Sequence, residues 1–168
     1  QTWKYNKLLA DQHDIIDKRR AELLDTDRAW QEIFERSARA TLLDKELPRD
    51  TLVRAAREIM LYHLDLGWSD HLALMDDVRE SIHLRAIARE TPIDEFHRIA
   101  VREFKELAQR AVDNAVDTFN EVPIDADGAH LEEQGLARPS ATWTYMVSDN
   151  PLAGSGNSLL RGIGNIFR

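Results

Sequence analysis

The stretch from Trp68 to Pro92 decides the fold of this chain; it reads WSDHLALMDDVRESIHLRAIARETP. Its apolar residues recur at helical spacing as far as a break at 89–92, where a second helix has its own start signal. Thr91 is a good N-cap, Pro92 suits the first helical position, and Asp94 stands where a capping-box acid belongs. Because only about four residues separate the two helices, they are predicted to fold back on each other as an antiparallel hairpin.

Helical periodicity extends from this hairpin in both directions. We predict a first long helix over about residues 3–38, a second over about 51–88 and a third over about 92–120. The first has no Gly or Pro and carries an apolar residue every seven positions. A helix this long needs partner helices, so we expect the hairpin to lean on it. The residues expected in the shared core are Leu9, Ile16, Leu23, Trp68, Met75 and Phe104.

Residues 121–168 have a different character. The segment 121–136 holds five acids and no Lys or Arg, which favours a solvated linker. Segment 142–147, Thr-Trp-Thr-Tyr-Met-Val, predicts a short β-strand whose pairing partner is expected outside this chain. The fold class is therefore all-α, with an extended C-terminal tail that contains one short β-strand.

Composition limits the possible functions. A length of 168 residues suits one domain with a real core. A net charge of −8 argues against a general nucleic-acid or anionic-membrane binder. Without cysteine, disulfides and thiolate metal sites are excluded and a cytosolic setting is allowed. No apolar run could span a membrane and no signal peptide is recognised. The chain opens at Gln1 directly into helical sequence, which favours a fragment of a larger protein.

Catalytic and metal chemistry find little support in the sequence. No Gly-rich phosphate loop followed by Lys-Ser or Lys-Thr occurs, so no nucleotide site is predicted in this segment. Asp76 and Asp77 are adjacent on a helix and point about 100° apart, so they favour a solvated face over an acid–base pair. His63 and His71 share a helix face, but Gly67 stands midway between them. Histidines hydrogen-bonded at helix interfaces are therefore favoured, and no metal site is predicted.

The order of residues in the hairpin resembles the C-terminal helical region of SecA, the ATPase that drives proteins through the bacterial SecYEG channel. That pattern is a Trp, three residues on a His-Leu, then an Asp, an Arg, an Ile-His-Leu-Arg, and a Pro followed by an acidic-aromatic pair. The matching positions are Trp68, His71, Leu72, Asp76, Arg79, Ile82, His83, Leu84, Arg85, Pro92, Glu95 and Phe96. The resemblance covers residues 51–120 well and 1–36 weakly.

This resemblance implies a domain plan. Residues 1–120 would form a helical scaffold domain with a long scaffold helix and an antiparallel two-helix finger at about 51–120, and 121–168 a linker and tail. Most SecA proteins insert a wing domain near 39–50, and this chain has no room for one. With the cysteine-free tail, this indicates the accessory, second SecA paralogue of actinobacteria.

The resemblance also implies partners. No cofactor is expected in this segment, since ATP and Mg belong to motor domains that it does not contain. The implied partners are those motor domains, the SecYEG channel and an unfolded preprotein, but no nucleic acid. The implied location is cytoplasmic, peripheral at the inner face of the plasma membrane. The alternative is a non-enzymatic helical adaptor that binds partner helices.

The SecA finger inserts into the channel mouth and contacts the translocating polypeptide. Its tip corresponds here to Ile87, Ala88, Arg89, Glu90 and Thr91. Ile87 stands where a Tyr is common, so an apolar contact with substrate is one interpretation and packing of the hairpin end is the other. Residues with an implied scaffold or regulatory role are Trp68, Arg79, His83 and Arg85.

Overall fold

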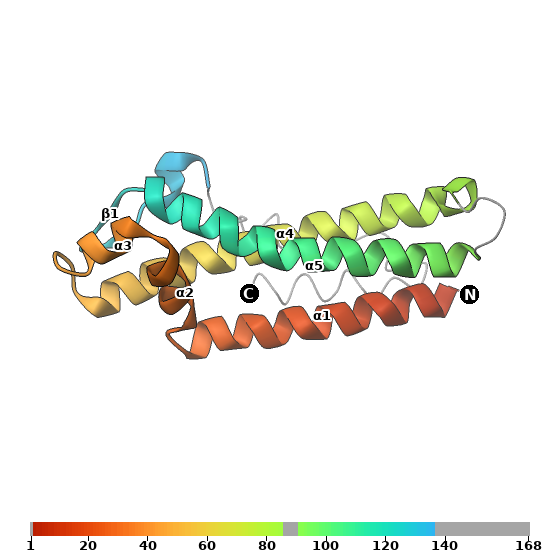
Figure 1. Ribbon diagram of the computed structural model, residues 1–168, viewed down its shortest axis with the longest axis horizontal. Helices are drawn as coiled ribbons and strands as arrows, with labels where there is room; N and C mark the ends of the chain where they lie inside the picture. The colour runs from red at the N-terminus through yellow and green to blue at the C-terminus, as the bar shows by residue number, and fades with distance from the viewer. Residues whose placement is uncertain (1, 86–90, 137–168) are drawn as a thin grey trace. The chain divides into compact units, whose positions relative to one another are not determined.

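The computed structural model describes residues 2–85 and 91–136, without the side chains of 83–85. Within these ranges the chain forms five α-helices: α1 (Thr2–Asp25), α2 (Arg28–Arg36), α3 (Ala38–Leu43), α4 (Arg49–Arg85) and α5 (Pro92–Glu121) (Figure 1). Two short strands, β1 (Ile124–Asp125) and β2 (Gly128–Ala129), and a 3₁₀ turn at Leu131–Gln134 follow. The all-α prediction is confirmed, while the strand predicted at 142–147 lies outside the described residues.

The first helix is shorter than the predicted 3–38 because it is interrupted at Thr26, between the end of α1 and the start of α2. The Thr26 hydroxyl donates to the Glu22 carbonyl at 2.6 Å and accepts from the Arg28 amide at 3.2 Å. Short polar side chains of this kind compete with helical backbone bonds. From α4, the Arg57 guanidinium donates to two carbonyls at this break, at 2.8 Å and 3.0 Å. These bonds satisfy acceptors that the helix end leaves unpaired.

The described residues form two compact units, and each long helix contributes to both. The first unit contains the described residues among 1–17 and 67–108. The second contains those among 18–66 and 109–138. Each unit has its own apolar core.

In the first unit, α4 and α5 run in opposite directions. Gly67 lies against Leu107, where an added Cβ would stand 3.4 Å from the Leu107 Cγ. One turn further along α4, the His71 ring lies 5.7 Å from the Phe104 ring, which is earlier on α5. The antiparallel arrangement of the predicted hairpin is thus confirmed within this unit.

The α1 helix completes the first unit as a third helical segment beside α4 and α5 (Figure 1). Tyr5 of α1 meets Phe96 of α5 edge to face, with ring centroids 4.6 Å apart. The predicted core positions Leu9, Ile16, Trp68 and Met75 are buried here, and Leu23 is buried in the second unit. Phe104 is only half-buried, so its predicted burial is wrong. Its ring packs against Trp68 and His71 and stays partly exposed.

The second unit is centred on Trp30 of α2, which is 2% exposed. Its ring lies 6.0 Å from Phe119 of α5 and 5.4 Å from Phe34. The Arg49 guanidinium covers the same indole at 5.4 Å from the ring centre, a cation–π contact. Arg39 of α3 donates to two backbone carbonyls around the end of α5, each at 2.7 Å. Aromatic packing and these charge-assisted bonds hold α2 and α3 in place.

Residues 121–136, predicted to be a solvated linker, contain a small anchored hairpin. β1 pairs antiparallel with β2, and Gly128 at the turn adopts a φ of 116°, which suits only glycine. Val122 and Leu131, on either side of the hairpin, are buried. The acids of this segment are exposed, as in a linker, but the prediction missed the apolar anchors.

The described helices are also informative about membranes. None of the helices within residues 2–85 and 91–136 combines the length and the apolar character needed to cross a bilayer.

Candidate functional site

The predicted finger tip is described only at its C-terminal end. Ile87, Ala88, Arg89 and Glu90 lie outside the described residues. Thr91 is exposed, and its side-chain oxygen accepts from the Asp94 amide at 3.3 Å while its hydroxyl donates to the Asp94 carboxylate. The predicted N-cap and the predicted acid three residues later are therefore both in place, and α5 starts at Pro92 as expected.

The predicted regulatory residues all lie on α4. The Arg79 guanidinium donates to the Asp76 carboxylate at 2.6 Å, one turn earlier on the same helix. Both side chains are partly exposed, so this pair contributes little to stability. His83 and Arg85 lie in the last turn of α4, and their side chains are outside the description.

Trp68 is the centre of a buried aromatic group in the first unit. It is 1% exposed, and its ring stacks on His71 with centroids 5.6 Å apart. The His13 ring of α1 lies 5.7 Å away, and Phe104 of α5 meets the indole edge to face at 6.2 Å. Trp68 thus joins all three helical segments of this unit.

Beside this aromatic group, Gln12 makes a hydrogen-bonded network that the sequence interpretation missed. Its side-chain amide donates to the backbone carbonyl of Ala100 on α5 at 3.1 Å. Its amide oxygen lies 2.8 Å from Nε2 of His71 on α4. Gln12 and His71 are each 4% exposed. The sequence signal that could have indicated this network is Gln12 itself, a polar residue on the apolar face of α1 between Leu9 and Ile16.

These contacts indicate which atom donates in the bond between Gln12 and His71. Because the Gln12 amide nitrogen faces the Ala100 carbonyl, its oxygen faces His71 and needs a donor there. Nε2 of His71 therefore carries a proton and donates to Gln12. We call Gln12, His71 and the Ala100 carbonyl the Gln12 network.

Two polar atoms next to this network have no hydrogen-bond partner in the described part of the chain: Nε1 of Trp68 and Nε2 of His13. Nδ1 of His13 lies 3.5 Å from the Asp17 carboxylate. His13, Asp14 and Asp17 could each offer one ligand atom to a metal ion. Asp14 and Asp17 are exposed, and exposed acids at helical spacing are common without a metal ion.

The second unit confirms the interpretation of histidines as hydrogen-bonded interface residues. Nε2 of His63 on α4 lies 2.7 Å from the hydroxyl of Thr118 on α5. Burial lowers the pKa of His63, and the nearby Asp117 carboxylate opposes this only in part. His63 is therefore a neutral hydrogen-bonding residue near pH 7.

A pocket of about 360 Å³ lies beside the β-hairpin of the second unit. Three carboxylates line it, those of Glu58, Glu132 and Glu133, together with His130. The Asp125 carboxylate bonds His130 at 2.7 Å and raises its pKa. Carboxylates repel phosphate groups, so this pocket is unsuited to the phosphates of a nucleotide.

The geometry of the first unit is that of a scaffold: an antiparallel helical hairpin fixed to a long helix by a buried aromatic group and a buried polar network. Residues 1–122 match the family described as the SecA wing and scaffold domain. The chain belongs to this family, and the resemblance drawn from the hairpin motif is confirmed.

Corynebacterial and mycobacterial relatives named SecA 2 support the accessory paralogue. The chain is 74% identical over 168 residues to the Corynebacterium efficiens protein named protein translocase subunit SecA 2, covering 100% of this chain and 22% of that protein. The Corynebacterium glutamicum protein of the same name is 72% identical over 169 residues, with 100% and 22% covered. A Mycolicibacterium smegmatis SecA 2 is 50% identical over 171 residues, with 99% and 22% covered. The chain thus spans about a fifth of the length of these relatives.

Proposed function

We propose that this chain is the helical scaffold and substrate-engaging finger of an ATP-driven protein translocase of the SecA type. The observation that carries the proposal is the antiparallel α4–α5 hairpin docked on α1, in a chain whose family is the SecA scaffold. A hairpin of two long helices with a short connection reaches away from its base. The finger would act at its tip, and the scaffold would hold its base.

The parent protein would supply the chemistry. ATP and Mg would bind in motor domains outside this segment, and the finger would convert their movements into displacement of an unfolded preprotein. The channel would be SecYEG. Such a translocase works in the cytoplasm, bound peripherally at the inner face of the plasma membrane.

The proposed domain plan keeps residues 1–120 as scaffold and 121–168 as linker and tail, without a wing domain. Only residues 44–48 connect α3 and α4, close to the place where a wing domain would be inserted. This short connection supports the assignment to an accessory paralogue.

The tip tests the proposal. In the parent translocase, Ile87→Asp should reduce export of a preprotein into membrane vesicles that contain the channel, because a hydrated charge replaces an apolar contact. Basal ATP hydrolysis should stay unchanged. Ile87→Tyr should keep export, since it retains a large apolar surface and restores the residue that is common in the family.

Leu42→Asp is the matched control for this test. Leu42 is an apolar residue of α3 that is 61% exposed, so the same charge is introduced without loss of core packing. Export that is equal in Ile87→Asp, Leu42→Asp and wild type would leave Ile87 with a packing role only. It would then favour the helical adaptor, which the absence of nucleotide-binding motifs upstream in the parent would support further.

A further inference from the structure

The two buried residues Leu9 and Ile16 do not by themselves define a single register for α1 in the first unit. Leu9 and Ile16 are both buried on α1 and stand seven residues apart. Moving α1 by one heptad, about 10.5 Å, would place one where the other was. Apolar contacts are non-directional, so such patterns leave the sliding position of a helix poorly specified.

The Gln12 network removes this ambiguity because its bonds are directional. One amide donates to α5 and accepts from α4, so both partners must stand opposite the same residue of α1. A displacement of α1 by one helical turn, about 5.4 Å, takes both contacts well beyond bonding distance. The polar pattern also does not repeat, since Tyr5 precedes Gln12 by seven residues and Arg19 follows it by seven.

We propose that Gln12 is a positioning residue for the finger: its two bonds fix the register of α1 against α4 and α5 in the first unit. The part of this inference that concerns transport rests on the proposed function. The energetic logic is that a single buried polar contact in an apolar bundle selects one register at some cost in stability. The unpaired Nε1 of Trp68 beside the network agrees with a core that is not optimised for stability alone.

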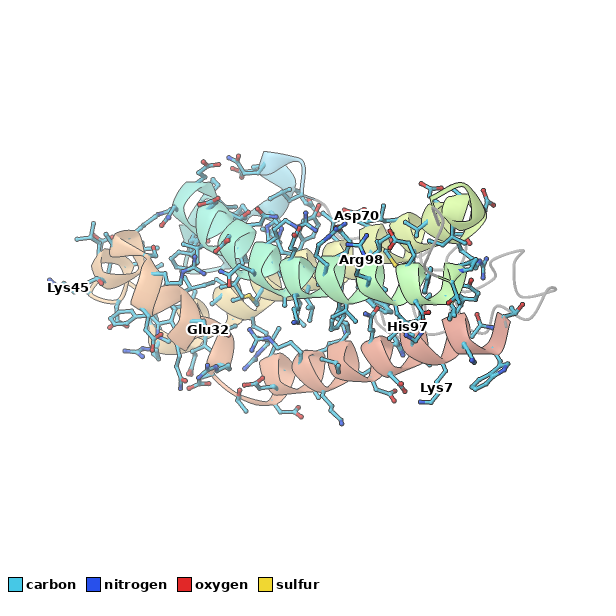
Figure 2. All side chains as sticks on the ribbon, turned by 45° about the vertical axis from the view of Figure 1, so that its right-hand side comes forward. Lys7, Glu32, Lys45, Asp70, His97 and Arg98 are labelled. Carbon is cyan, nitrogen blue, oxygen red and sulfur yellow. The ribbon has the colours of Figure 1, made fainter. Side chains whose placement is uncertain are left out.

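The register can be measured directly in the parent translocase. Lys7 on α1 and His97 on α5 are both exposed and belong to the first unit (Figure 2). After replacement of both by Cys, with other cysteines of the parent removed, spin labels report their distance by pulsed electron paramagnetic resonance. Wild type should give one narrow distance distribution. Gln12→Met, which is close in volume and lacks both bonds, should broaden it or add a second peak.

Two further variants separate positioning from stability. The double variant Gln12→Met with His71→Phe removes both side chains of the Gln12–His71 bond, so neither loses the other as a partner, and its melting temperature should recover relative to Gln12→Met alone. Its distance distribution should nevertheless stay broad. His71→Gln, made with Gln12 unchanged, keeps an N–H donor for Gln12 and should retain a narrow distance distribution. Thr118→Val is the matched control, because it removes a partly buried hydrogen bond between α4 and α5 in the second unit without touching α1.

Transport completes the test. Gln12→Met and the double variant should both export about fivefold less preprotein per ATP hydrolysed, at the lower end of usual coupling between distant sites. A narrow distribution in Gln12→Met would overturn the proposal. So would a double variant in which transport recovers together with melting temperature, or a broad distribution with unchanged transport. Failure of the proposed function would be recognised separately, as a wild-type parent that exports nothing.

Discussion

Trp68 offers the sharpest test of how the first unit is held together, and the change to make is Trp68→Ala. The side chain is 1% exposed and contacts α1, α4 and α5 at once. A buried Trp removes about 200 Å² from water. At about 25 cal/mol per Å², its loss corresponds to about 5 kcal/mol, and measured Trp→Ala changes fall at about 3–5 kcal/mol.

One feature of the structure lowers this figure. Nε1 of Trp68 has no hydrogen-bond partner among the described residues, and an unpaired buried donor costs about 1–3 kcal/mol. Alanine removes that cost, so we expect Trp68→Ala to lower the free energy of unfolding by about 3 kcal/mol. Trp68→Phe removes the same N–H but keeps most of the ring contacts, and should cost less than about 1.5 kcal/mol.

The assay is urea denaturation of this chain followed by far-UV circular dichroism, which reports the helices without relying on Trp fluorescence. The two variants are compared through their denaturation midpoints at equal slope. A cost below about 1 kcal/mol for Trp68→Ala would show that the site collapses around the smaller residue. A Phe variant as unstable as the Ala variant would mean that the indole N–H is satisfied, which would refute the reasoning about the unpaired donor.

Three other predictions address pH, regulation and the tail. Burial lowers the pKa of His63 below its usual 6.5, so the contribution of His63 to stability is present above pH 6.5 and is lost as pH falls through the folded-state pKa. Denaturation midpoints measured across this pH range test the prediction. His63→Gln should flatten the dependence of the midpoint on pH. Arg79→Glu together with Arg85→Glu should raise the basal ATPase rate of the parent, because these arginines would hold a docked, restrained state through weak ion pairs. The rate is measured without channel or preprotein. Equal rates in the variant and wild type would mean that both arginines serve only the packing of the helical bundle. The amides of residues 142–147 should be protected from hydrogen exchange in the full-length parent and unprotected in the isolated chain. The reason is that a lone strand needs a sheet edge, which the motor would provide. Strong protection in the isolated chain would contradict this prediction.

Much of the fold could be predicted because apolar periodicity and end signals act locally. Thr91, Pro92 and Asp94 placed the start of α5, and the spacing of Trp68 and Met75 identified buried positions. The interruption of the helix at Thr26 was missed because local end signals are weak there: neither Gly nor Pro marks it. Its cause is partly distant in sequence: Arg57 on α4 supplies donors to the carbonyls that the break exposes.

The hairpin at 124–129 illustrates a second limit. Exposed acids dominate the composition of this segment, and composition favours solvation. What anchors it is the burial of Val122 and Leu131, two apolar residues too widely separated to form a periodic pattern. Gly128 signals a turn only once its positive φ is known. Such anchors become visible only when the core that receives them is in place.

The Gln12 network shows why the most informative residue of a helical interface can be the one that breaks its pattern. Periodicity assigns Gln12 to the buried face of α1 and then offers no reason for an amide to be there. The reason lies on two other helices, in a His 59 positions away and a carbonyl 88 positions away. Apolar residues identify which faces meet, and any of several registers satisfies them. A polar residue on that face restricts the helices to the one register in which its hydrogen bonds can form. A polar residue that breaks an apolar pattern is therefore a candidate positioning residue.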